Sequence, residues 1–449
     1  MTAPTGRTTV IWFRRDLRTA DHPALLAAVD AAGGGGRVAP VFVADGRLLN
    51  GAGANRRAFL AGSLADLDAR IDGGLTLRRG PSTRTVCEFA ARVAADTVFA
   101  TGDCTPYGRR RDAAVGRALA DDGRTLALIG SPYAVAPGRV LTGGGAPYRV
   151  FTPFRRAWSD HGWSPPSAAP DGVRWTEPDS DTTIGEIGAE PASPGLPAPG
   201  EPAALAALDA FLAGPAASYD GDRNRPDRQG TSNLSPYLRF GCIHPRQILS
   251  RLGDGPDAGA FRSEIAWREF YADVLWHHPA SAWKPLLAVG DHIRWDSGPT
   301  ADRRFDAWAA GETGFPLVDA GMRQLRNEGW MHNRIRMLTA SFLVKDLHID
   351  WRRGARLFLE LLVDGDLASN NHGWQWVAGT GTDAAPFHRV FNPSLQAQRF
   401  DPDGSYVARY VPDAGRPGYP EPIVDHAVER VEALDRWQEA KLSLAGASP

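Results

Sequence analysis

TTVIWFRRDLRTADHPALLAAVDAAGGGGRVAPVFVAD, residues 8–45, sets the architecture of the first part of this 449-residue chain. Residues 8–13 and 38–45 are β-branched and aromatic runs, which predict buried strands. Asp21 before Pro23 predicts the start of a helix between them. The alternation continues, with helices expected at 56–71, 83–95 and 109–122 and strands at 75–80, 97–103 and 125–130. Strands that alternate with helices indicate an α/β domain with a parallel, Rossmann-like sheet.

This segment lacks the usual dinucleotide fingerprint. Gly33–Gly36 follow the first helix instead of joining a strand to a helix, so they fit a turn better than a phosphate cradle. A ligand of such a sheet still lies beyond the carboxyl ends of the strands. The polar residues expected at these ends are Arg14, Arg15, Asp16, Asp45, Asp103 and Tyr107.

The length of the chain and the change of sequence pattern along it indicate two domains. A chain of 449 residues is too long for one hydrophobic core. Residues 136–202 are rich in proline and lack periodicity, which predicts a partly extended linker on the surface. This linker separates an α/β domain at 1–135 from a domain at 203–449 whose pattern is helical throughout, so the second domain is expected to be all-α.

Composition excludes several classes of protein. Hydrophobic residues make up 43% and charged residues 23% of the chain, as in ordinary soluble globular proteins. No apolar run spans a bilayer and no signal-peptide core is present, so no membrane partner is expected. The three cysteines have neither metal nor disulfide spacing, so we expect a cytoplasmic protein without a metal. The net charge of −2 neither favours nor excludes a nucleic acid as a partner. We expect a monomer.

A second informative stretch is DGDLASNNHGWQWVAGTGTDAAPFHRVFNP, residues 364–393. It combines acids, adjacent asparagines and two tryptophans, and so many polar side chains on a core helix imply a polar partner. Asparagine amides donate and accept hydrogen bonds, and glycines allow a close approach of the backbone. The composition predicts a pocket for a large, flat, heteroatom-rich ring. A polar loop after a helix with ordinary buried tryptophans is the alternative.

Glu264, Trp267, Arg268 and Tyr271 recur at i, i+3, i+4 and i+7, so they share one helical face. A carboxylate beside an indole on an otherwise apolar face is costly to bury without a function. The simpler explanation is a salt bridge between Glu264 and Arg268. The sequence alone leaves both explanations open.

A cluster of hydroxyl residues also precedes a helix. Thr231, Ser232 and Ser235 offer hydroxyl and backbone N–H groups that suit a diphosphate with Arg223 nearby, or else form a plain N-cap. The tryptophans on separate elements are, on physical grounds alone, better explained as core residues: Trp295, Trp351 and Trp374.

One helix pair has a predicted ionic link. Asn333, Arg336 and Met337 share a helical face. Arg336 has two candidate partners, Asp364 and Asp366, and either pair would fix the two helices together.

Six segments together resemble the DNA photolyase/cryptochrome family: WFRRDLR (12–18), TSNLSPYL (231–238), EIAWREFY (264–271), GWMHNRIRM (329–337), LVKDLHIDWR (343–352) and residues 364–393. The resemblance begins at residue 8 and is dense from 219 to 400. GWMHN and WREF resemble the class I cyclobutane pyrimidine dimer photolyases, whereas (6-4) photolyases place a second histidine where Asn333 stands. The resemblance implies an α/β antenna-binding domain followed by an all-helical FAD-binding domain.

The resemblance implies FAD as the cofactor. The positions that match those holding a U-shaped FAD are Tyr219, Thr231, Ser232, Asn233, Leu234, Ser235, Arg268, Asn333, Arg336, Asp364, Gly365, Asp366 and Asn370. It also implies a pocket for the damaged dinucleotide, in which Glu264 hydrogen-bonds the thymine carbonyls while Trp267 and Trp376 stack on the bases. The catalytic positions matched are Glu264, Trp267, Asn333, Met337 and Trp376.

Further positions match other functions of the family. The DNA-contacting positions are Arg223, Glu264, Trp267, Asn333, Arg334, Arg389 and Gln396. The positions that carry an electron from the surface to the flavin are Trp295, Trp351 and Trp374. Arg56 and Asp103, with the PYGR turn at 106–109, resemble members that bind the antenna deazaflavin 8-HDF rather than folate, although Thr105 departs from the acid expected there.

The implied function is light-driven repair of DNA that contains cyclobutane pyrimidine dimers. A dimer inside a duplex is out of reach of a buried cofactor, so it must be flipped into a pocket and held by stacking. The first alternative is a cryptochrome-type blue-light photoreceptor, which Asn370, Met337 and the Glu264/Trp267 pair disfavour. The second is a flavin-dependent oxidoreductase, for which the sequence offers no nicotinamide or substrate site.

Overall fold

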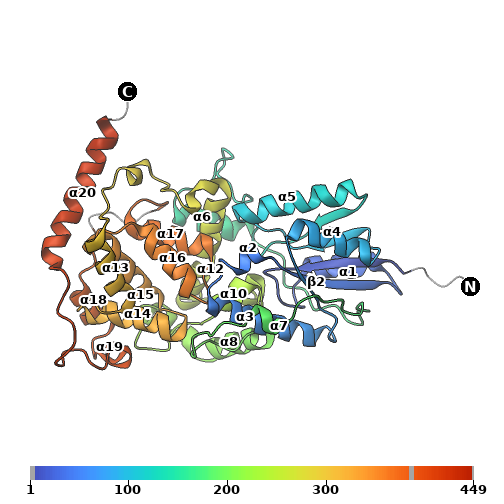
Figure 1. Cartoon of the computed structure of the whole chain (residues 1–449), viewed down its shortest axis with the longest axis horizontal. Helices are drawn as coiled ribbons and strands as arrows, with labels where there is room; N and C mark the ends of the chain where they lie inside the picture. Colours follow the sequence, from blue (N-terminus) through green and yellow to red (C-terminus); the bar gives the residue numbers. More distant parts are fainter. Residues whose placement is uncertain (1–5, 384–388, 447–449) are drawn as a thin grey trace, which may run out of the picture.

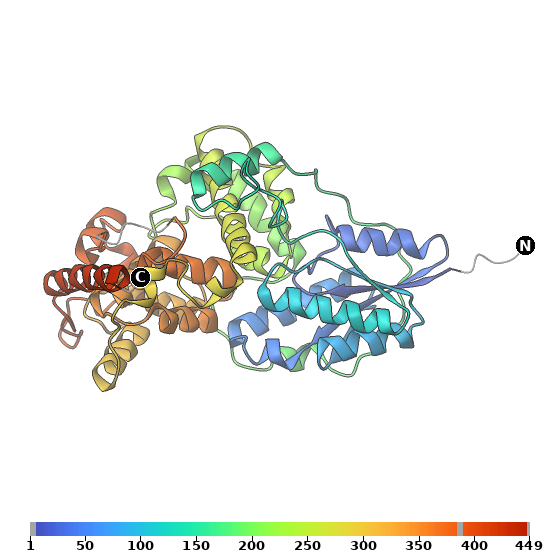
Figure 2. The same ribbon diagram turned by 90° about the horizontal axis from the view of Figure 1, so that it is seen from above.

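The first domain is built on a parallel sheet. The computed structural model describes residues 6–383 and 389–446. Five strands pair in the order β3-β2-β1-β4-β5, all parallel: β1 (Thr8–Phe13), β2 (Arg37–Ala44), β3 (Thr76–Arg79), β4 (Thr97–Ala100) and β5 (Thr125–Leu128). The order reverses between β1 and β4, which makes their carboxyl ends the expected binding edge. The predicted Rossmann-like sheet is confirmed (Figure 2).

Helices cover both faces of this sheet. They are α1 (Pro23–Ala32), α2 (Gly46–Leu49), α3 (Ala54–Arg70), α4 (Ser82–Arg92) and α5 (Pro106–Asp121). Successive residues of a strand point to opposite faces. Accordingly Val10 and Trp12 pack with α4 and α5, while Ile11 and Phe13 pack with α1 and α3. Burial on both faces explains why β1 is apolar throughout instead of alternating.

The segment predicted as a linker is partly folded. It contains α6 (Phe151–His161) and α7 (Ile184–Ile187), which the proline-rich composition concealed. Phe151, Phe154 and Trp158 have helical spacing and are all buried, and this apolar stripe makes α6 stable against α12 (Figure 1). The chain then returns along the sheet, where Arg174 O and Thr176 N hydrogen-bond the backbone of Val38 at 2.9 Å and 3.0 Å. The segment predicted to be a partly extended surface linker therefore also contains a helix, α6, whose apolar side is buried.

Every regular element that the structure describes beyond residue 200 is helical. The α-helices are α8 (Glu201–Ala213), α9 (Tyr219–Asp222), α10 (Ser235–Phe240), α11 (Pro245–Leu249), α12 (Pro256–His277), α13 (Pro299–Ala310), α14 (Pro316–Glu328), α15 (Asn333–Ser341), α16 (Trp351–Leu361), α17 (Leu367–Ala378), α18 (Pro393–Phe400), α19 (Ser405–Tyr410) and α20 (His426–Gly446). Short 3-10 turns cover Pro215–Ser218, Pro279–Ala282 and Ala288–Asp291, and a π-helical turn covers Phe342–Asp346. The all-α second domain is confirmed.

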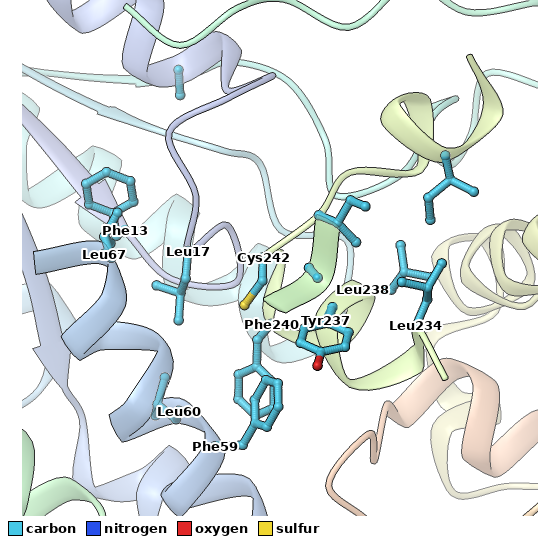
Figure 3. Packing of buried hydrophobic residues seen from close by; sticks show 14 of the residues in the cluster. Phe13, Leu17, Phe59, Leu60, Leu67, Leu234, Tyr237, Leu238, Phe240 and Cys242 are labelled. Carbon is cyan, nitrogen blue, oxygen red and sulfur yellow. The ribbon is translucent and has the colours of Figure 1, made fainter. Parts of the chain in front are cut away.

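One of the hydrophobic clusters contains residues of both domains and so joins them. Phe59 of α3 packs against Tyr237 and Phe240 of α10, with ring centroids 5.5 Å and 5.2 Å apart (Figure 3). Gly241 ends α10 in the left-handed conformation, with a φ of 69°, and an added Cβ would lie 2.1 Å from the carbonyl oxygen of Arg15. The α/β domain therefore packs directly against the backbone of the helical domain.

None of the helices in the described ranges is long and apolar enough to cross a membrane.

Candidate functional site

Helix α17 is the centre of the site, because its pattern of burial departs from that of a core helix. Most of its residues are buried, yet Asn370, Gly373 and Trp376, spaced three apart, are half-buried. Apart from neighbouring residues and the backbone of its own helix, no heavy atom of the described residues lies within 4 Å of the position that a Cβ on Gly373 would take. Space is therefore open beside α17 at Gly373, between the positions of the half-buried Asn370 and Trp376, which suits the flat ring predicted from the sequence.

Of the two ionic links predicted for Arg336, the one with Asp364 is confirmed. Both of its carboxylate oxygens accept hydrogen bonds from Arg336 of α15, from Nη1 at 3.2 Å and from Nη2 at 2.8 Å. The same guanidinium donates from Nε to Met331 O at 2.7 Å. This bidentate pair fixes α15 against the segment that precedes α17.

Asp366 has a different partner, which lies in the other domain. Its Oδ1 accepts from Ala368 N and Ser369 N at 3.1 Å and 3.2 Å and so caps α17, while its Oδ2 accepts from Arg15 at 2.6 Å. Burial on its own would raise the pKa of Asp366, but Arg15, Arg239 and Arg268 outweigh it and hold this pKa well below its usual range. The acid that caps α17 is thus kept anionic with help from the α/β domain.

Arg268 does not form the predicted salt bridge with Glu264. Its guanidinium donates to Pro132 O and Leu238 O, both at 3.1 Å, and lies 4.4 Å over the ring of Tyr133. The carbonyl groups of Pro132 and Leu238 thus satisfy the Arg268 guanidinium, and it does not pair with the Glu264 carboxylate one turn away.

Glu264 pairs instead with Arg223, whose Nη2 lies 2.6 Å from Glu264 Oε1. This oxygen is buried, yet the contact lacks the geometry of a hydrogen bond and the described residues give it no other donor. Burial raises the pKa of Glu264, and the nearby Arg223 offsets only part of that increase. The side chain therefore retains unused hydrogen-bonding capacity and an increased tendency to carry a proton.

The hydroxyl cluster lies just before α10. The helix begins at Ser235, and its N-cap is Leu234, which has no side-chain oxygen to accept from the first N–H groups. Asn233 has a positive φ of 52°, Thr231 donates to the Asn233 side chain, and Ser232 accepts from Leu234 N. The plain side-chain N-cap that was the alternative for this cluster is absent, which leaves backbone donors for a ligand.

The predicted substrate-contacting residues lie on helices packed against α17. Helix α12, which carries Glu264 and Trp267, packs on α17, and so does α15, which carries Asn333 and Met337. The Asn333 amide lies 4.0 Å from the Met337 sulfur, so these two side chains are neighbours one turn apart. The ring of Trp267 stacks on Phe151 of α6, with centroids 3.7 Å apart and an interplanar angle of 8°.

The predicted DNA-contacting arginines gather around Arg334. Its guanidinium donates to Asn224 Oδ1 from Nε and Nη2 at 3.1 Å and 2.5 Å and lies 4.6 Å over the ring of Phe400. Burial lowers the pKa of Arg334, and the neighbouring cations lower it further: Arg223, Arg399 and Arg389. Gln396 lies half-buried on α18. The result is a basic surface next to the Glu264 side chain.

The three tryptophans predicted to carry an electron belong to one hydrophobic cluster. Trp374 and Trp351 are 2% and 1% exposed inside it, and half-buried Trp295 packs against it. Trp374 contacts the rings of Phe358 and Trp308, with centroids 5.0 Å and 6.2 Å away. Burial thus decreases from Trp374 and Trp351 to Trp295, which the sequence alone did not reveal.

Comparison with known proteins identifies the family. Family models described as "DNA photolyase" and "FAD binding domain of DNA photolyase" match residues 9–171 and 261–417. A deoxyribodipyrimidine photo-lyase from Streptomyces griseus is 41% identical, covering 96% of this chain and 98% of its own. The chain belongs to the DNA photolyase family. Its helical domain is accordingly an FAD-binding domain.

Solved photolyase structures agree with this fold. The structure of a bacterial class III photolyase from Agrobacterium tumefaciens has a TM-score of 0.91 and 37% identity, covering 98% of this chain and 99% of the other. An archaeal photolyase from Sulfolobus tokodaii, solved with two FAD molecules, has a TM-score of 0.83 and 28% identity, covering 96% and 99%. The two FAD molecules of that archaeal protein imply a novel light-harvesting cofactor there.

The two predicted antenna residues have different partners, a backbone carbonyl for Arg56 and a guanidinium for Asp103. Arg56 is buried and donates to Gly51 O at 3.0 Å, while its Nε has no hydrogen-bond partner among the described residues. Burial lowers the pKa of Arg56 to about 10. Asp103 accepts from Thr105 at 2.9 Å and pairs with Arg111 at 3.2 Å, and no contact joins it to Arg56 in the described ranges.

Two contacts were not predicted from the sequence: that of Arg15 with Asp366 and that of Phe151 with Trp267. Arg15 was placed at the carboxyl end of β1, but its partner lies 351 positions away, so no local pattern announces the pair. Phe151 begins the helical stripe of α6, which was a usable signal. Within the described residues, no group of histidine, cysteine and acidic side chains is arranged to hold a metal.

Proposed function

We propose that this chain is a deoxyribodipyrimidine photolyase that splits cyclobutane pyrimidine dimers in light. The observation that carries the proposal is the packing of α12 and α15 against α17, so that the helices carrying the predicted substrate-contacting residues are neighbours. These helices carry a half-buried carboxylate with one buried oxygen that lacks a hydrogen bond among the described residues, an Asn–Met pair and an indole. Near-full-length relatives at 34–41% identity carry the photo-lyase name, which supports the same function.

The residues present fit FAD. Gly373 leaves space beside α17, and the backbone before α10 offers donors without a side-chain cap. Asp364, Asp366 and Asn370 would hold the cofactor from α17 and its N-terminus, and Arg268 and Arg336 from α12 and α15. When bound in its reduced form and excited by light, FAD supplies the electron that opens the dimer.

The chain's own side chains grip the substrate. Arg223 and Arg334 lie on the basic surface and would bind backbone phosphates, which positions the strand without reading its sequence. The indoles of Trp267 and Trp376 would stack on the flipped bases, and such stacking tolerates any base. Poor stacking of a damaged dinucleotide in the duplex lowers the cost of flipping and supplies selectivity.

Glu264 would stabilise the negative charge that develops on the dimer. A carboxylic acid donates a hydrogen bond to a carbonyl oxygen only when it is protonated, and the raised pKa favours that form. A DNA phosphate competes with Glu264 for Arg223, and loss of this ion pair raises the pKa of Glu264 further. The binding of substrate therefore favours the form of Glu264 that assists the reaction.

The test is repair of an oligonucleotide with one thymine cyclobutane dimer by photoreduced protein, with a dark control. We expect loss of the dimer only in light. Glu264→Ala should lower the quantum yield while FAD absorption is unchanged, and Glu264→Gln, which keeps an N–H donor, should retain more of the yield. FAD binding without repair in light would contradict the proposal and favour the photoreceptor alternative.

The finer assignments are also proposals. GWMHN and WREF support class I, although one neighbouring structure is named class III. For the antenna we propose 8-HDF near Arg56 and Asp103, supported by the buried unpaired Nε of Arg56. Extraction of the purified protein and absorption spectra distinguish a deazaflavin from folate or a second FAD. The electron route through Trp295, Trp351 and Trp374, the domain limits at 135 and 202, the monomer and the cytoplasmic location stay predictions as well.

A further inference from the structure

We propose that Phe151, in the connector between the domains, is a positioning residue that fixes the indole of Trp267 for stacking on the substrate. The inference rests on the proposed function, because it assigns Trp267 to the substrate pocket. The inference assigns to α6, within the segment 136–202, a role in shaping the substrate pocket, whereas the sequence predicted only a linker on the surface.

The geometry of the two rings supports this role. The Phe151 and Trp267 rings are parallel within 8° at a centroid distance of 3.7 Å, so Phe151 covers one face of the indole. Phe270 and Tyr271 touch the same indole at steeper interplanar angles of 70° and 43°. Of the described aromatic neighbours, Phe151 is the one that sets the plane of the ring. A base that stacks on this indole would have to take the face opposite Phe151, because Phe151 covers the other one.

Phe151 is itself held in place from the other side of the pocket. It is the first residue of α6, and its N–H donates to Asp383 Oδ2 at 3.1 Å. Thr382 donates from its hydroxyl to Arg149 O at 2.7 Å. Both bonds come from the segment that follows α17, the helix that carries Trp376. A carboxylate at the first N–H of a helix also interacts favourably with the helix dipole.

The rest of α6 is anchored to α12, the helix that carries Trp267. Trp158 Nε1 donates to the buried Glu269 at 2.6 Å, and Arg155 donates to Ser263 Oγ at 3.1 Å. One short helix therefore connects the two indole-bearing helices. Displacement of α6 would tilt Trp267 and change its distance to Trp376 without touching the flavin-binding acids.

The experiment compares Phe151→Leu with a matched control, Phe154→Leu, one turn further along α6. Phe154 is also buried but contacts Phe270 and Tyr148 instead of Trp267. Phe151→Tyr, which keeps an aromatic face, is the rescue variant. Each FAD-containing protein is labelled with 5-fluorotryptophan, and the Trp267 resonance is assigned from its loss in Trp267→Phe. Dark binding of dimer-containing oligonucleotide and repair in light are then measured.

We expect Phe151→Leu to shift the Trp267 fluorine resonance, because the ring current of Phe151 is lost. Dark affinity for the damaged oligonucleotide should fall roughly 2- to 10-fold, as one aromatic pair is removed. Phe154→Leu should leave both readouts near those of the parent chain, and Phe151→Tyr should restore them. Flavin absorption should be the same in all variants.

Two results would overturn the inference. One is an unchanged Trp267 resonance in Phe151→Leu, and the other is an equal loss of dimer affinity in Phe154→Leu. If Phe151→Leu does not fold, Phe151→Met takes its place, and an unaltered Trp267 resonance or an unchanged dimer affinity in that variant contradicts the inference. Failure of the parent chain to bind or repair the dimer refutes the proposed function, while the fluorine shift still tests the Phe151–Trp267 contact.

Discussion

Glu269 provides a quantitative test of how the connector is held against the helical domain. Its carboxylate is 2% exposed and accepts hydrogen bonds from Ala134 N at 2.5 Å, Val135 N at 3.0 Å and Trp158 Nε1 at 2.6 Å. The Glu269 side chain of α12 thus holds both the end of the α/β domain, at Ala134 and Val135, and helix α6, at Trp158. Burial raises the pKa of Glu269 from an ordinary value of 4.5 to about 7, although the three hydrogen bonds oppose this change.

The direction of the pH effect follows from this raised pKa. Between pH 4.5 and about 7 the folded chain keeps a proton that the unfolded chain has lost, so stability decreases as the pH rises. A tenfold change in proton affinity corresponds to about 1.4 kcal/mol. Glu269 therefore lowers the free energy of unfolding by about 3 kcal/mol across its whole titration, of which about 2.5 kcal/mol falls between pH 5 and pH 8.

The assay is urea unfolding of the FAD-containing chain and of Glu269→Gln at several pH values from 5 to 8. Glutamine does not titrate, so the stability of the parent relative to the variant should decrease by about 2.5 kcal/mol over this range. Other buried groups, such as Asp346 with a pKa of about 6, titrate in both proteins and cancel in the difference. Parallel pH profiles would refute the reasoning, because they would mean that the N–H donors keep Glu269 ionised.

Three further outcomes are expected. Trp374→Phe should block photoreduction of the flavin, followed by absorption, while chemically pre-reduced protein still repairs the dimer; normal photoreduction would exclude this tryptophan from the route. Arg334→Met should weaken binding to all DNA sequences alike and reduce the slope of log affinity against log salt by about 1 in a titration series. Gly241→Ala should lower the free energy of unfolding by at least about 1 kcal/mol in urea, since it combines a left-handed φ with a clash against Arg15.

The sequence predicted the sheet and the helical domain because both depend on local patterns. The buried strands are continuous apolar runs, and the helices have regular apolar stripes. The Arg336–Asp364 pair was also predictable, since a limited set of acids stood in the adjoining motif. Residues 151–161 have the same kind of stripe, but the surrounding prolines and glycines concealed it.

The partner of Glu264 could not be predicted for a different reason. A sequence shows the cation four residues away, Arg268, and the spacing favours an ion pair. In the folded chain two carbonyl groups already satisfy Arg268, and Arg223, 41 residues earlier, approaches Glu264 instead. Which of two cations reaches a carboxylate depends on tertiary competition for each donor, and this competition is absent from local spacing.

Charged residues of both domains meet at the junction between them, so both domains contribute to the proposed flavin pocket. Arg15 and Arg239 both face Asp366, and Arg239 also donates to Gly365 O at 2.8 Å. Burial, together with the neighbouring Arg15, lowers the pKa of Arg239 to about 9, although Asp366 and Asp103 oppose this change. Buried charge is stable only when it is compensated. An anionic cofactor at this junction would supply that compensation, so its binding stabilises the contact between the domains as well as the pocket itself.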